Sequence, residues 1–204
     1  MRRASGRPKG ADSAARREEI LDAAARIFSE EGYRGTSMSA IARACGLSQT
    51  GLLHHFPTKE DLLRAVMERR DATDAARALG SDAERPRGWD FVDRLVQLVL
   101  NNQGQPGIIR LYTTVAGEAV DPAHPANPWL VAHHRGAAHA FREALREAAA
   151  DGRLKPDAPE ESIVRCLLAG MDGLQIQWLS DAEYQDMARD FAVLADALRA
   201  RWEA

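Results

Sequence analysis

The stretch that decides the fold runs from Thr36 to Lys59 and reads T-S-M-S-A-I-A-R-A-C-G-L-S-Q-T-G-L-L-H-H-F-P-T-K. Its pattern predicts two short helices joined by a tight turn. Ser37 and Ser48 each precede one helical pattern, where a hydroxyl oxygen can accept a hydrogen bond from a free N–H group of the first turn. Gly46 lies between the patterns, where glycine adopts a left-handed backbone without a Cβ penalty.

The second of these helices has one apolar side and one polar side. Leu47, Leu52 and Phe56 fall at spacings of five and four, which predicts a buried face. The other side is rich in hydrogen-bonding groups and carries no carboxylate. It comprises Ser48, Gln49, Thr50, Gly51, Leu53, His54 and His55. A short helix of this kind after a glycine turn is typical of a helix-turn-helix, which places its second helix in a DNA major groove.

The longer run G-L-S-Q-T-G-L-L-H-H-F-P-T-K-E-D-L-L, preceded by E-E-G-Y-R-G-T-S, resembles the DNA-binding domain of the TetR family of bacterial transcriptional regulators. The resemblance covers roughly residues 14–70. It implies an all-α fold, in which a three-helix head is joined by a bridging helix to a C-terminal helical bundle that dimerises. It also implies repression as the default activity. Leu53 stands where the family usually has Tyr, so the phosphate hydrogen bond of a Tyr hydroxyl is missing.

The recognition helix is expected to read bases near its start and to contact phosphates around its end. Gln49 and Thr50 are the candidate base readers, since a Gln amide suits bidentate pairing with adenine. Gly51 would let the helix lie close to the groove, and Leu53 would add only apolar contact. The candidate phosphate contacts are Ser37, His54, His55 and Lys59, and Ser48 completes the expected DNA-binding residues as the helix cap.

Positive charge concentrates at the same end of the chain. Residues 1–70 hold 13 Lys+Arg against 9 Asp+Glu, whereas the remainder holds 14 against 21. The first ten residues carry no acid and four basic side chains, namely Arg2, Arg3, Arg7 and Lys9. Gly6 to Lys9 reads G-R-P-K and resembles the core of an AT-hook, an extended segment that lies in a narrow minor groove. This basic arm is expected to be disordered and either to contact DNA or to be an ordinary solvated tail.

The domain plan follows from helical periodicity and from breaks in composition. We expect the disordered arm at 1–12, the helix-turn-helix domain at 13–58, the bridging helix at 59–79 and the ligand-binding and dimerisation domain at 80–204. The bridging helix begins at a capping box, T-K-E-D from Thr58 to Asp61. The predicted body helices are Trp89–Gln103, Pro106–Val120, Trp129–Ala150, Pro159–Leu179 and Ala182–Trp202.

The last two of these helices carry more apolar residues than one face of a small bundle needs, so residues 159–202 are predicted to form a homodimer interface. A ligand-controlled repressor needs an effector site, so we expect a small molecule of unspecified chemistry to bind inside the body. The candidate lining residues combine apolar bulk with isolated polar tips. They are Tyr112, Thr113, Trp129, His133, Met171 and Gln175.

Two alternatives stay open beside this prediction. A regulator of the same fold without a small-molecule ligand would have a filled core, and the same six residues would then be ordinary packing. A helical enzyme is the other alternative, but the sequence has no nucleophile elbow, P-loop or catalytic carboxylate pair. The histidines outside the recognition helix lack the i, i+4 spacing of a metal site, so no metal and no cofactor is expected.

The remaining observations concern compartment. The two cysteines, Cys45 and Cys166, have no C-x-x-C spacing and are expected to be buried, reduced thiols. No apolar run approaches the roughly 20 residues of a membrane span, and residues 1–12 have no apolar core that would suit a signal peptide. A cytoplasmic protein without a membrane partner is expected.

Overall fold

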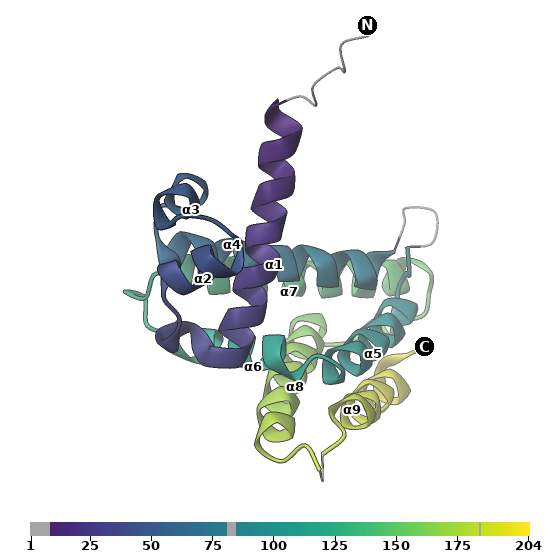
Figure 1. The fold of residues 1–204 in the computed structure, drawn as a ribbon. Coiled ribbons are helices and arrows are strands. Elements are labelled where there is room, and N and C mark those ends of the chain that lie inside the picture. Colours follow the sequence, from purple (N-terminus) through teal and green to yellow (C-terminus); the bar gives the residue numbers. More distant parts are fainter. Residues whose placement is uncertain (1–8, 81–84, 184) are drawn as a thin grey trace, which may run out of the picture. The chain divides into compact units, whose positions relative to one another are not determined.

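A computed structural model describes residues 9–80, 85–183 and 185–204. In these ranges the chain forms nine α-helices and no strand, which confirms the all-α prediction (Figure 1). The chain divides into two compact units, residues 1–68 and residues 69–204. The boundary falls inside one continuous helix, α4 (Lys59–Leu79), which therefore contributes residues to both units.

The first unit is built from α1 (Lys9–Gly35), α2 (Met38–Ala44), α3 (Gln49–His55) and the beginning of α4. The apolar periodicity of the sequence forms its core. Ile20, Phe28, Ile41, Leu52 and Phe56 are all no more than 1% exposed. This core fixes α2 and α3 against each other and against α1, as the predicted head requires.

The ends of α1 differ from the expectation in an informative way. The helix begins at Lys9, whereas we expected an arm up to residue 12 and a helix from Ser13. Gly10 therefore does not stop the helix, because a single glycine costs only about 1 kcal/mol in a helix interior. At the other end, Gly32 has φ 76 and ψ 159 and breaks the helical backbone. Residues 1–8 of the expected arm lie outside the described residues.

The second unit contains α5 (Trp89–Gln103), α6 (Pro106–Glu118), α7 (Asn127–Ala150), α8 (Glu160–Ser180) and α9 (Met187–Trp202). Within it, α9 packs along both α5 and α8, and α8 packs against α6 and α7 (Figure 1). Leu194 of α9 lies against Gly170 of α8, where any side chain would collide with it. The missing side chain at Gly170 thus lets α8 and α9 of the same chain approach closely.

The predicted body helices are confirmed in number and order, with shifts at their ends. The largest shift concerns α9, which begins at Met187 and not at Ala182. The Asp186 carboxylate accepts a hydrogen bond from the Arg189 N–H, so this residue supplies the N-cap that fixes the start. Part of the expected linker, residues 81–84, lies outside the described residues.

Candidate DNA interface and effector site

The helix-turn-helix is held by short-range polar contacts that the sequence predicted. Ser37 Oγ accepts from Ala40 N at 3.1 Å, and Ser48 Oγ accepts from Gly51 N at 3.1 Å. Gly46 adopts φ 66 in the turn between the helices. These caps satisfy N–H groups that would otherwise lack partners at the helix starts. The local geometry of a helix-turn-helix is therefore present in the described head.

The face of α3 that is directed away from the core carries the candidate base readers. Leu52 is fully buried, whereas Gln49, Thr50 and His54 are exposed. Leu53 is 37% exposed and presents an apolar side chain on this polar surface. A methyl group added at Gly51 would lie 3.3 Å from Ser48 Oγ, so glycine at this position also gives the cap its room.

The residues expected to contact phosphates have partners within the head. His55 offers its backbone carbonyl to the Arg17 guanidinium at 3.0 Å, and the same guanidinium lies 4.0 Å from the Phe56 ring centre. Lys59 Nζ donates to the carbonyl oxygens of Tyr33 and Thr36, each at 2.8 Å. Sequence reasoning missed Arg17, because the bond joins positions 38 residues apart.

Most of the basic arm lies outside the described residues. Arg2, Arg3 and Arg7 lie outside the described residues, and Lys9 is the first residue of α1. Whether the basic arm contacts DNA stays a prediction.

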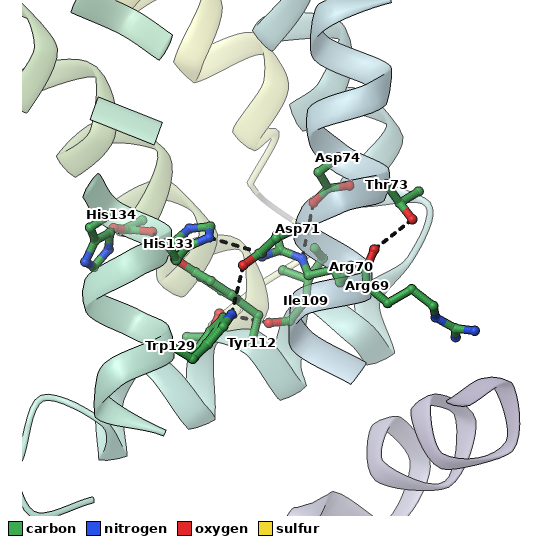
Figure 2. A network of polar contacts seen from close by, with 12 residues as sticks. Arg69, Arg70, Asp71, Thr73, Asp74, Ile109, Tyr112, Trp129, His133 and His134 are labelled. Carbon is green, nitrogen blue, oxygen red and sulfur yellow. Dashed lines mark hydrogen bonds and ion pairs between the residues drawn. The ribbon is translucent and has the colours of Figure 1, made fainter. Parts of the chain in front are cut away.

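In the second unit a network of polar contacts joins three helices around the end of α4. The Trp129 indole N–H donates to Asp71 Oδ2 at 2.8 Å, and His133 Nδ1 lies 3.1 Å from Asp71 Oδ1. The Arg70 guanidinium lies 4.2 Å from the centre of the Tyr112 ring. Figure 2 shows Asp71 between Trp129 and His133, with Arg70 and Asp74 on the same helix. Three of the six candidate lining residues, Tyr112, Trp129 and His133, are thus brought together.

Tyr112 links His133 to a second acid. Its hydroxyl donates to Asp172 Oδ1 at 3.1 Å and also lies 3.1 Å from His133 Nε2. The other ring nitrogen of His133, Nδ1, faces the Asp71 carboxylate. His133 of α7 therefore lies between an acid of α4 and the tyrosine of α6.

Burial and charge shift the acid–base properties of the groups around it. The pKa of Tyr112 is raised well above its ordinary value, first by burial and then by the negative charge of Asp172. Burial also raises the pKa of Asp74, although Arg70 opposes that shift. The pKa of His134 is raised chiefly by its hydrogen bond with Asp172, whose carboxylate lies 3.3 Å away.

The other expected lining residues lie beside this network. The Gln175 amide donates to Thr113 Oγ1 at 3.0 Å, and Gln175 is buried, at 8% exposure. Met171 is half-buried and packs against the apolar core of the unit. Sequence reasoning missed the acids that organise the cluster, Asp71 and Asp172. Asp172 could have been noticed as a carboxylate inside the apolar run L-L-A-G-M-D-G-L.

No metal site accompanies these histidines. In the part of the chain that the structure describes, no three His, Cys, Asp or Glu side chains are grouped as metal ligands. His124 faces Glu118 at 3.7 Å, and His139 is exposed. Cys166 is also exposed and Cys45 is half-buried, so the expectation of two buried thiols is wrong. Among the described helices, none is long and apolar enough to cross a membrane.

Comparison with known proteins gives a consistent picture. Residues 20–66 match the family model described as bacterial regulatory proteins, tetR family. The HTH-type transcriptional regulator UidR of Escherichia coli K12 is 32% identical over 189 residues, which cover 90% of this chain and 89% of UidR. The HTH-type transcriptional repressor AcnR of Corynebacterium diphtheriae is 25% identical, over 90% of this chain and 92% of AcnR.

The solved structure of a SmeT–triclosan complex has the same fold. It is 24% identical, its TM-score is 0.75, and the match covers 93% of this chain and 92% of SmeT. The comparison therefore spans both units of the chain, not the helix-turn-helix alone.

Proposed function

Because this chain belongs to the TetR family of bacterial regulatory proteins and is a DNA-binding transcriptional regulator, not an enzyme, we propose that it is a dimeric, effector-controlled repressor. It binds a palindromic operator in the cytoplasm and leaves it when a small molecule binds the body. The observation that carries the DNA-binding part is the exposed, carboxylate-free face of α3 on a doubly capped helix-turn-helix.

In this proposal Gln49 and Thr50 read base edges, and Ser37, His54 and His55 position the helix on the backbone. Leu53 adds an apolar contact, for which a thymine methyl is the fitting partner. The experiment is selection of bound duplexes from a random pool by the purified protein, followed by binding of Gln49→Ala to the selected duplex and to its single-base variants. Loss of a bidentate contact costs about 1 to 3 kcal/mol at one base position. An equal loss of affinity for every base variant would contradict the assignment.

The dimer is supported by exposed apolar side chains on α8 and α9. Ile176 is 54% exposed and Val193 is 63% exposed in the single chain. A two-fold interface of residues 159–202 would bury them and would place two recognition helices on two half-sites of one operator. Sedimentation at micromolar concentration tests this proposal, and a monomer that still binds the selected duplex with full affinity would refute it.

Effector control is supported by the polar network at the end of α4. Asp71 and Arg70 hold the last part of this helix to aromatic side chains of α6 and α7, and the first part of the same helix belongs to the head. A ligand that competes for Tyr112, Trp129 or His133 would thereby move a helix that the head shares. By linkage, the operator must weaken ligand binding by the same factor by which the ligand weakens operator binding.

The effector is tested with a panel of aromatic and amphipathic molecules, among which triclosan is a reasonable member because SmeT binds it. Ligand binding is followed by tryptophan fluorescence, and release of DNA is followed by gel shift. If molecules of the panel bind without releasing DNA, the result would favour the alternative, a regulator of the same fold without a small-molecule switch.

A further inference from the structure

The Lys59 side chain has an unusual position for a residue that is expected to contact DNA. It is half-buried, and its amine donates to the carbonyl oxygens of Tyr33 and Thr36 at 2.8 Å each. The same nitrogen lies 4.3 Å from the centre of the Tyr33 ring. Two of the three ammonium donors are therefore bound inside the head.

The two carbonyl groups belong to the junction between α1 and α2. Tyr33 follows the break at Gly32, and Thr36 immediately precedes Ser37, the N-cap of α2. Thr36 is only 3% exposed, and its hydroxyl donates to the Gly32 carbonyl at 2.8 Å. A single amine thus ties the start of α4 to the end of α1 and to the residue before α2.

Electrostatics favour this internal arrangement. Lys59 is the first residue of α4, and a cation is unfavourable at the positive end of a helix dipole. The two carbonyl oxygens that accept from the amine carry partial negative charge, which offsets that cost. The first turn of α4 also contains Glu60, which accepts from the Tyr33 hydroxyl at 3.0 Å, and Asp61. Two carboxylates beside one lysine do not make an anion-attracting helix start.

From this geometry we propose that Lys59 is a positioning residue, which acts on DNA binding by fixing the α1–α2 junction and not by holding a phosphate. The effect reaches DNA through the Ser37 cap, α2 and the packing of α2 on α3. This inference rests on the proposed function, because it concerns how the same recognition helix is presented.

The experiment compares Lys59→Met, which removes the amine at nearly constant side-chain length, with Arg43→Met, which removes a cation from the exposed last turn of α2. Both variants are made in the full chain. The probes are the duplex selected by the wild-type protein and a scrambled duplex of the same composition. Affinity for each is measured over a range of salt concentrations, well below the melting temperature.

If Lys59 positions the helix, Lys59→Met weakens binding to the selected duplex about tenfold, the equivalent of one charged hydrogen bond. Binding to the scrambled duplex stays nearly unchanged, because phosphate contacts supply non-specific affinity. The slope of log K against log salt also stays nearly unchanged. Arg43→Met keeps the ratio of the two affinities.

A second variant separates position from charge. Lys59→Arg retains the positive charge, so this variant would lose little operator affinity if the role of Lys59 were to hold a phosphate. A planar guanidinium does not place one nitrogen between two carbonyl oxygens as an ammonium does, so the positioning role predicts that the affinity ratio falls here as well. If amide exchange shows that the head of Lys59→Met is unfolded, the Arg variant decides alone.

The contrary outcome is distinct. If Lys59 held a phosphate, Lys59→Met would lose affinity equally on both duplexes, and its slope of log K against log salt would be smaller by about one unit. Lys59→Arg would then bind nearly as the wild type does. That result overturns the inference and leaves the proposed function intact. A wild-type protein that enriches no sequence from the pool refutes the proposed function instead.

Discussion

The head and the body of this protein use polar side chains over different distances along the chain. In the head, Ser37, Ser48 and Thr58 each accept from an N–H group three residues ahead. In the body, Asp71 accepts from Trp129 across 58 positions, and Tyr112 donates to Asp172 across 60. The head contacts therefore form with the helices themselves, whereas the body network forms only when α4, α6, α7 and α8 are packed.

This difference makes the two units separable in experiments, because all four tryptophans lie in the second unit, at positions 89, 129, 178 and 202. Tryptophan fluorescence therefore reports unfolding of the body, and operator binding or amide exchange in α1 to α3 reports the head. Each of the following predictions asks whether a change in one unit stays in that unit.

The largest effect is expected from Asp71→Ala. The change leaves the Trp129 indole and the His133 ring without their carboxylate and removes one acceptor of Arg70. Loss of one partner from such a partly buried network costs about 3 kcal/mol. The free energy of unfolding by urea, followed by tryptophan fluorescence, should fall by that amount. Glu143→Ala, which removes a partly exposed acid paired with Arg146 in its own helix, should leave it nearly unchanged. Equal shifts for both variants would refute the importance of the network.

The next effect is expected in the head, from Gly46→Ala. The φ of 66 at Gly46 is a left-handed conformation that costs an L-residue about 1 to 2 kcal/mol. Gly35→Ala is the matched control, because Gly35 has no positive φ and open space around its Cα. Amide exchange in α2 and α3 should accelerate for Gly46→Ala alone. A shift of the tryptophan transition by the same amount would mean that the units do not unfold separately.

Ser48→Ala should have a slightly smaller effect on the same unit. It removes the oxygen that accepts from Gly51 N and costs about 1 kcal/mol, whereas Ser48→Gly should cost only a few tenths. Operator affinity measured at low temperature should fall with the fraction of folded α3. Equal destabilisation by Ala and Gly would indicate that the hydroxyl is not an effective cap.

The smallest effect concerns the pH dependence of the body. The pKa of His134 is raised in the folded state, so its contribution is fully present below the unfolded pKa of about 6.5 and is lost as pH rises through the folded value. Because the side chains of His134 and Asp172 are each 43% exposed, we expect only a few tenths of a kcal/mol. As pH rises above about 6.5, the body of the wild-type protein should lose this small contribution to its stability, and His134→Gln should abolish that loss. An unchanged profile would show that solvent screens the pair.

The sequence predicts more of the head than of the body. The caps at Ser37 and Ser48, the turn at Gly46 and the buried Leu52 and Phe56 were all expected, and the structure confirms each of them. The start of α9 was missed by five residues because an N-cap at Asp186 outweighs helix-favouring residues before it. Tyr112, Trp129 and His133 were proposed from their chemistry alone, and their grouping around Asp71 was not.

By itself, the sequence determined the features in which partners lie within about one helical turn: where most helices start, where the chain turns, and which faces are apolar. Only the tertiary structure decided which acid faces which histidine, that His133 lies between Asp71 and Tyr112, and that Lys59 donates to two carbonyl groups of the α1–α2 junction. The physical reason is that these contacts join residues 21 to 62 positions apart, whose meeting depends on how whole helices pack and leaves no spacing in the sequence.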